Sequence, residues 1–198
     1  MRYWLELVAW LACAVYSTIP AFWLMIHPFA ERWRTRRRSP YFVLVPLWVL
    51  MWVVMALATR AWRHVTIYRT EWTWIAAAFL FATGFSLYAV SGRSFGAKQL
   101  GGVPELHGSH REQRLVKDGI RAQVRHPVYL AHLCQMLGWS VGTGLAVCWA
   151  LTVFAMATGA VMIRMEDAVL EKRFGDHFRT YRSSVPAVLP KVLSPRQL

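Results

Sequence analysis

Two short polar stretches, about forty residues apart, contain the side chains of this sequence that are best suited to chemistry. One is Arg-His-Pro at 125–127, which opens an apolar segment, and the other is Arg164 with Glu166 and Asp167, which closes one. Proline is favoured as the first residue of a helix, where its missing N–H needs no partner. The arginine and histidine would then flank a helix N-terminus, whose free amides and dipole attract anions. Cations, helix amides and carboxylates around one pocket would suit a zwitterionic ligand.

Membrane-spanning helices are the elements that would position these stretches. Of 198 residues, 56% are apolar, eleven are tryptophan and only 17% are charged, which is an unusual composition for a soluble protein. A helix needs about 20 apolar residues to cross a bilayer, and the windows 7–26, 42–58 and 74–91 each provide one span. The apolar region 128–163 is long enough for a helical hairpin that turns in the glycine-rich stretch 138–144. We therefore expect an all-α polytopic membrane protein with five transmembrane helices.

A helical hairpin returns to the face from which it starts, so the two polar stretches should be neighbours. Residues 92–119 form a polar loop with six glycines, which would cover them. In residues 163–190, apolar side chains recur at three- and four-residue spacing opposite charged ones, which predicts amphipathic helices with a bend at Gly175. We expect a three-helix membrane scaffold over residues 1–91 and the region that carries the chemistry over 92–198.

The basic residues predict the orientation. Lys and Arg gather in the segments 32–38, 92–125 and 164–198, which share one side of the membrane if five spans alternate. Cytoplasmic loops are enriched in these residues, so we expect this side to be cytoplasmic and the N-terminus outside. The net charge of +13 then reflects topology and attraction to anionic membrane lipid. No nucleic-acid partner is expected, because no folded basic domain remains to present a groove.

Each of these residues also has a simpler interpretation. Arg and His at the end of a span commonly extend toward lipid headgroups, and the acidic pair could only balance neighbouring arginines. His132 lies alone in an apolar segment, as a buried structural histidine would. His107 and His110 have no further Cys or His pair beside them, so no metal site is expected.

An ordered set of short motifs carries a family resemblance. They are Leu115-Val116, Gly119, Arg125-His126-Pro127-x-Tyr129, Glu166-Asp167, Phe174-Gly175, Tyr181 and Val185-Pro186 with Pro190. This order resembles the C-terminal half of the isoprenylcysteine carboxyl methyltransferase family and its prokaryotic membrane relatives. The resemblance implies S-adenosyl-L-methionine as methyl donor, bound at the cytoplasmic ends of the last two helices. It also implies a small or lipidic acceptor with a carboxylate, thiol or amine, reached from the bilayer, and a place in a bacterial inner membrane.

The resemblance further implies roles for individual residues. Implied cofactor contacts are Gln113, Arg114, Leu115, Val116, Arg121, His126, Pro127, Val128, Tyr129 and Glu166. The substrate-binding arginine of the family would align near Met162, with Arg164 close by, and from the residues themselves we take Arg125, Arg164 and Asp167 as candidate catalytic residues. Methyl transfer is an in-line displacement that depends on alignment, and an amine or hydroxyl acceptor would also need a general base, with Asp167 or His126 as candidates.

Two other functions stay open at the level of sequence. A membrane reductase of the sterol or steroid type has C-terminal helices of similar outline and binds NADPH, whose 2′-phosphate could contact Arg114, Arg121 and Arg125. A non-catalytic membrane protein could instead bind anionic lipid through its basic face, with a strong dependence on salt.

Overall fold

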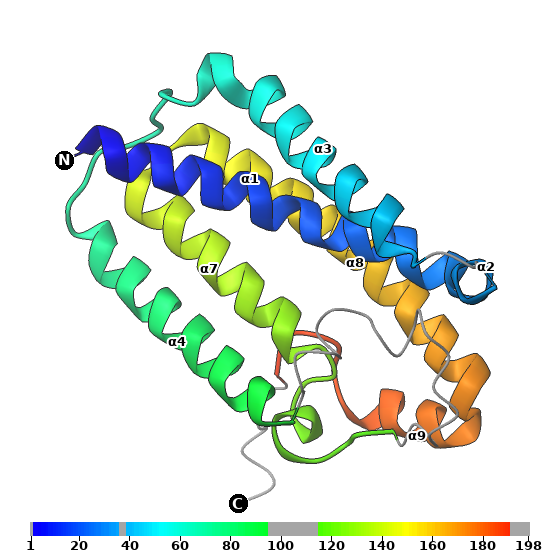
Figure 1. The fold of residues 1–198 in the computed structure, drawn as a ribbon. Helices are drawn as coiled ribbons and strands as arrows, with labels where there is room; N and C mark the ends of the chain where they lie inside the picture. The colour runs from blue at the N-terminus through cyan, green and yellow to red at the C-terminus, as the bar shows by residue number, and fades with distance from the viewer. Residues whose placement is uncertain (1, 36–38, 95–114, 191–198) are drawn as a thin grey trace, which may run out of the picture.

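Helices make up the fold. The computed structural model describes residues 2–35, 39–94 and 115–190, and within these ranges the only β-structure is an isolated bridge between Thr66 and Leu145. The long helices are α1 (Arg2–Ile26), α3 (Tyr41–Thr59), α4 (Thr73–Ser94), α7 (Pro127–Thr143) and α8 (Ala146–Phe174), and the short α9 (Asp176–Ser184) follows. The long helices form one bundle (Figure 1). The all-α prediction is confirmed.

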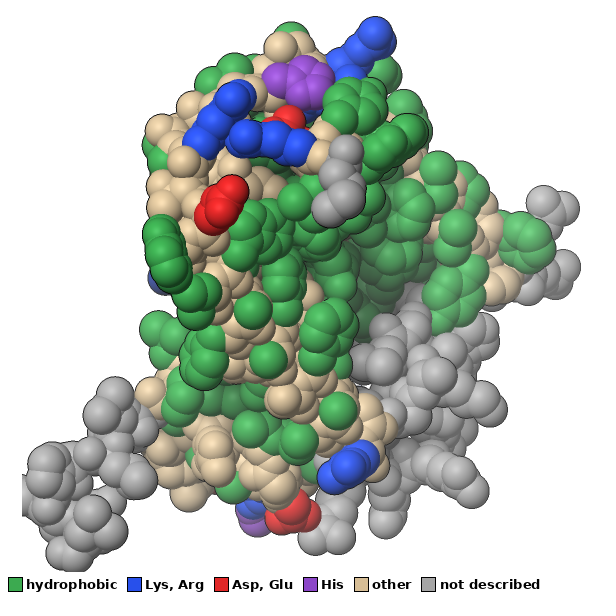
Figure 2. Space-filling view, turned by 90° about the vertical axis from the view of Figure 1, so that its left-hand side faces the viewer, with side chains coloured by type: hydrophobic (Ala, Val, Ile, Leu, Met, Phe, Trp, Pro, Cys, Tyr) green, Lys and Arg blue, Asp and Glu red, His purple; other side chains and the backbone are tan. Residues whose placement is uncertain are grey.

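Four helical segments in the described part of the chain are long and apolar enough to cross a membrane. They are Arg2–Phe29, Tyr41–Trp62, Thr73–Arg93 and Ala146–Phe174. The remaining long helix, α7, has 17 residues and is therefore about 25 Å long, so the count of five spans stays a prediction. On the face shown in Figure 2, charged side chains gather toward the two ends and an apolar surface separates them. This distribution is the one that a bilayer requires.

The packing joins the first half of the chain to the second. Helix α4 packs along α7, and α1 packs along α8, with α3 outside α1. The contact between α4 and α7 is close because α7 presents Gly138, where a Cβ atom would lie 2.7 Å from the ring of Phe81. Small residues let membrane helices approach in this way. Two of the three helices of the expected scaffold, α1 and α4, therefore contact the last two helices individually.

The hairpin turn is shorter than the expected stretch 138–144, because α7 continues through Thr143 and only Gly144 and Leu145 separate it from α8. Gly144 ends α7 in the left-handed region, with φ of 65°, which glycine adopts without steric cost. The loop after α3 holds this turn: Ile67 N donates to the carbonyl of Gly144 at 2.8 Å, and Ala146 N donates to that of Val65 at 2.9 Å. The start of α8 is thus fixed by backbone pairing far from the polar stretches.

Helix α8 continues farther than the sequence pattern indicated. It runs without interruption to Phe174, so the Arg-x-Glu-Asp stretch lies inside a helix, and up to residue 190 the only separate amphipathic helix after it is α9. No Gly or Pro stands between Ile163 and Phe174, so nothing breaks the helix there. Gly175 has φ of 55° and makes the expected bend. Phe178 and Tyr181 of α9 then pack with Val185 against Leu170 and other apolar residues of α8.

Candidate functional site

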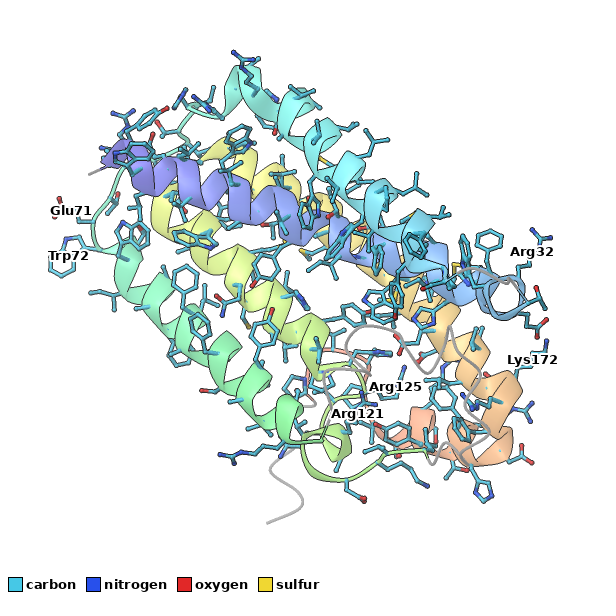
Figure 3. All side chains as sticks on the ribbon, viewed as in Figure 1. Arg32, Glu71, Trp72, Arg121, Arg125 and Lys172 are labelled. Carbon is cyan, nitrogen blue, oxygen red and sulfur yellow. The ribbon has the colours of Figure 1, made fainter. Side chains whose placement is uncertain are left out.

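The polar stretches meet where α7 begins beside α8. Arg125 Nη2 donates a hydrogen bond to Asp167 Oδ2 at 2.6 Å. His126 Nε2 lies 3.2 Å from Asp167 Oδ1, and His126 Nδ1 lies 3.4 Å from Glu166 Oε2. Two cations and two carboxylates from different helices therefore form one compact group, which we call the charged cluster. Figure 3 shows Arg125 near Arg121 at this end of the bundle, far from Glu71 and Trp72 at the other end.

Asp167 and Arg125 form the buried part of the charged cluster. Their side chains are only 5% and 8% exposed, and Arg182 of α9 places its Nε 3.8 Å from Asp167 Oδ2. Arg125 Nη1 also donates to the backbone carbonyls of Arg182, at 3.2 Å, and Val185. A buried guanidinium needs this many acceptors to offset its desolvation. This arginine therefore joins α7, α8 and the segment after α9.

The segment after α9 is also paired with the approach to α7 through the backbone. Arg125 N donates to the carbonyl of Pro186 and His126 N to that of Ala187, both at 2.9 Å. These bonds satisfy two amides just before the helix, and they bring residues 186–189 against its first turn. The chain after α9 thus becomes one wall of the site.

Glu166 is the more open carboxylate. Its side chain is 25% exposed. Its Oε2 atom is itself buried and faces His126 Nδ1 at 3.4 Å, without a hydrogen bond of normal geometry within the described residues. It interacts electrostatically with His126, with His27 of η1 (His27–Phe29) and with Arg121 of η3 (Gly119–Ala122). Adjacent residues on a helix point about 100° apart. Asp167 therefore faces the interior of the bundle, while Glu166 points to the partly exposed side of the site.

His126 is a cation in this environment. Burial by itself lowers the pKa of His126, but the carboxylates of Glu166 and Asp167 outweigh it and raise that pKa to about 9. The imidazolium donates toward both carboxylates and thereby connects the buried carboxylate to the open one. The charged cluster is electrically balanced without any ligand.

The structure places the remaining residues of the predicted site as follows. Pro127 is buried as the first residue of α7, and Val128 and Tyr129 follow it in the first turn, where backbone N–H groups lack intrahelical acceptors. Leu115 packs on the apolar side of α9, and Val116 is half-buried.

Of the remaining predicted site residues, Arg121 and Arg164 lie apart from the centre of the charged cluster. Tyr181 donates its hydroxyl to the carbonyl of Arg121 at 2.7 Å, which fixes η3 against α9. Arg164 lies on an exposed part of α8. Gln113 and Arg114 fall outside the described residues, as do His107 and His110.

Sequence reasoning missed two contributors to this site. His27 directly follows the first apolar window, and Arg182 stands in the stretch 163–190 that is predicted only to be amphipathic. His27 reaches Glu166 because α1 ends beside α8, and Arg182 reaches Asp167 because α9 folds back along α8. Nothing in local spacing indicates either contact, since both depend on tertiary packing.

An apolar cavity of about 250 Å³ begins next to the charged cluster. It lies between α1, α7, α8 and the segment after α9, and its lining includes Ile19, Tyr129, Met156, Ile163 and Leu189. Tyr129 belongs to both places: its ring centroid lies 5.8 Å from that of His126, and its hydroxyl donates to Met162 Sδ at 3.1 Å. The ring of Tyr129 therefore borders both the charged cluster and the apolar cavity.

Comparisons with known proteins show what the chain is similar to. The family described as phospholipid methyltransferase matches residues 72–177 of the chain. The protein-S-isoprenylcysteine O-methyltransferase of Schizosaccharomyces pombe is 33% identical over 84 residues, which cover 42% of this chain and 36% of that protein. An uncharacterized protein of Haemophilus influenzae is 30% identical over 59 residues, 29% of this chain and 94% of that protein. The chain thus spans about a third of the yeast relative. No solved structure matches.

Proposed function

Because the chain belongs to the phospholipid methyltransferase family, and so is a membrane methyltransferase, we propose that S-adenosyl-L-methionine is its methyl donor and binds at the charged cluster. The observation that carries this proposal is the open carboxylate of Glu166. Its side chain is 25% exposed, and its buried Oε2 atom is paired with His126 Nδ1 only at 3.4 Å, without a hydrogen bond of normal geometry among the described residues. It lies on α8 beside the N-terminus of α7, close to Ile163, which lines the apolar cavity. A ligand with a positive group, an anionic group and a reactive methyl between them suits these three features.

The residues at the site fit this donor. Glu166 can accept hydrogen bonds from its ammonium group or its ribose hydroxyls, and the first-turn amides of Val128 and Tyr129 can donate to its carboxylate. The ring of Tyr129 offers an apolar face for the adenine or the sulfonium. When bound, the donor supplies an electrophilic methyl group. We retain Leu115, Val116 and Arg121, with Gln113 and Arg114, as proposed contacts.

We assign Arg125 and Asp167 to positioning. The guanidinium of Arg125 bonds to Asp167 and to backbone carbonyls at the end of α9 and just after it. The methyl donor is therefore proposed to contact Glu166, His126 and the helix amides instead. The contribution of Arg125 and Asp167 is to hold α7, α8 and the last wall of the site at fixed distances. These distances matter because, in a displacement reaction, the acceptor atom, the methyl carbon and the sulfur must lie in line. Arg164, on the exposed part of α8, stays a proposed contact for a charged acceptor.

The acceptor is proposed to enter the apolar cavity from the bilayer, with its reactive group toward His126, which lies beside Tyr129. If that group is a carboxylate or a thiolate, its charge and the charge of the donor cancel as the transition state forms. A site that excludes water favours such a step, and no general base is needed. The apolar lining between α1, α7 and α8 provides that exclusion.

Thermal unfolding of the purified protein tests the donor site. We expect S-adenosylhomocysteine to raise the unfolding temperature of the wild type, whereas NADPH, the cofactor of a sterol-type reductase, should not. Glu166→Gln should abolish the shift. Glu171→Gln is the matched control, because Glu171 lies on the same helix and pairs with Arg179 and Arg182 at the surface. An equal shift in wild type and Glu166→Gln, or a shift with NADPH alone, would refute the proposed site.

The orientation is part of the proposal. Arg32, Arg121, Arg125 and Lys172 lie at one end of the bundle and Glu71 at the other (Figure 3), and the basic end is proposed to face the cytoplasm. In intact bacterial cells, a cysteine that replaces Glu71 should react with an impermeant maleimide. One that replaces Lys172 should react only after permeabilisation, and the reverse pattern would overturn the orientation.

A further inference from the structure

His132 is a polar side chain within the apolar cavity. It lies on α7, six residues after His126, and lines the cavity together with Tyr16 and Tyr129. Its ring centroid lies 5.3 Å from those of Tyr16 and Tyr88 and 6.3 Å from that of Tyr129. The neighbouring tyrosines come from three helices, α1, α4 and α7. The imidazole is therefore held in a fixed place by packing.

The hydrogen bond of His132 defines its tautomer. Nδ1 lies 2.6 Å from the backbone carbonyl of Val128, and a carbonyl can only accept. Nδ1 therefore carries the proton, and in a neutral ring Nε2 is an acceptor. The ring neighbours that the structure describes are tyrosines, which offer no charge to offset an imidazolium in this setting.

The other lining groups make this acceptor unusual. Leu133, Met136, Ala155, Met156, Gly159 and Ala160 surround the same space. The hydroxyl of Tyr129 is already used by Met162 Sδ. A purely hydrocarbon occupant would bury Nε2 of His132 without a partner, and leaving a buried acceptor unsatisfied is costly. An occupant with a hydrogen-bond donor at this depth removes that cost.

The helix sets the distance between the two ends of such a molecule. Six residues of α-helix separate His126 from His132, which corresponds to about 9 Å along the axis. Building on the proposed function, we propose that the methyl acceptor is an amphiphile that carries a hydroxyl group about 9 Å from its methyl-accepting group. His132 Nε2 accepts the hydrogen bond of that hydroxyl and so positions the acceptor. His132 takes no proton in the reaction.

Two synthetic probes test this inference. One is dodecanethiol, and the other is the same thiol with a hydroxyl about 9 Å along the extended chain. Their affinities are compared through the thermal shift they cause in the protein in lipid nanodiscs, over a titration and without methyl donor. The wild type should bind the hydroxylated probe roughly fivefold or more tightly than the plain one, the gain expected from one satisfied hydrogen bond.

Matched variants isolate the role of the acceptor nitrogen. His132→Phe keeps an aromatic ring and removes Nε2, so it should abolish the preference while the plain probe binds as in the wild type. Tyr16→Phe, which removes a different polar group from the lining of the same cavity, should keep the preference. His132→Gln restores an acceptor oxygen and should recover part of it. Equal affinity of the two probes for the wild type, or an unchanged preference in His132→Phe, would overturn the inference.

The two proposals fail in different ways. The shift caused by S-adenosylhomocysteine should be the same in wild type and His132→Phe, which also shows that the variant is folded. Loss of that shift in the wild type would contradict the donor site and leave the probe preference unaffected. Loss of the probe preference alone would contradict the hydroxylated acceptor and leave the donor site intact.

Discussion

Glu166 and Asp167 are adjacent carboxylates that should respond very differently to the loss of their charge. Asp167 is 5% exposed and bonds to Arg125, whereas Glu166 is 25% exposed with one oxygen that lacks a normal hydrogen bond within the described residues. Asp167→Asn keeps the size of the side chain but leaves the guanidinium of Arg125 buried without its counter-ion. We expect this variant to lose stability and Glu166→Gln to lose donor binding with little change in stability.

The structure gives the magnitude for Asp167→Asn. Breaking a buried ion pair by removing one partner costs about 3–5 kcal/mol. The low exposure of both side chains and the 2.6 Å contact place this pair in that class. With about 2–4 °C per kcal/mol for a chain of this size, the unfolding midpoint should fall by roughly 6–20 °C. Glu171→Gln removes a surface carboxylate from the same helix, and its midpoint should change little.

The assay is thermal unfolding in detergent without donor, followed by a double-mutant comparison. Replacing both members, as Arg125→Met with Asp167→Leu, removes both buried charges, and it should cost less than the sum of the two single replacements. The reasoning would be refuted if Asp167→Asn unfolded at the same temperature as Glu171→Gln. It would also be refuted if the double variant lost the full sum.

Two further predictions concern the ends of α7. The pKa of His126 is raised to about 9 by the carboxylates, above an unfolded value of about 6.5. The stabilisation that the charged His126 provides should therefore be complete below about pH 6.5 and lost as pH rises through about 9. Between these pH values, the unfolding temperature of the wild type should fall further than that of His126→Gln. At the other end, Gly144→Ala places a Cβ against a loop carbonyl at φ of 65° and should cost at least about 2 kcal/mol in denaturant unfolding. Gly92→Ala, on a helix with open space around it, should cost nothing.

The convergence of the polar stretches was predictable because it follows from chain geometry alone. A hairpin of apolar helices must bring its two ends together, and His126 and Glu166 indeed approach to 3.4 Å. The turn was equally readable, since Gly144 is needed for a left-handed residue. The helical fold class follows from the apolar windows in the same way.

The division of roles within the acidic pair was not predictable. Which of Glu166 and Asp167 faces the interior depends on how α8 is rotated against α7, and the apolar pattern on α8 is too uniform to define that rotation. The length of α8 and the place of α9 decide whether Arg182 reaches Asp167. The electrostatic interaction of His27 with Glu166 depends on where α1 ends. These features arise from packing between elements, which local sequence patterns do not encode.

The residues that the family match covers indicate which part of the chain binds the methyl donor and which part selects the acceptor. The match covers residues 72–177 and so contains α4, α7 and α8 with the charged cluster, while the cavity wall from α1, including Ile19, lies outside it. Donor binding should depend on the matched part and the choice of acceptor on α1. Ile19→Trp would fill the cavity, so it should reduce methylation of long-chain acceptors in membranes supplied with radiolabelled donor. The thermal shift by S-adenosylhomocysteine should persist, and a parallel loss of both would mean that α1 also shapes the donor site.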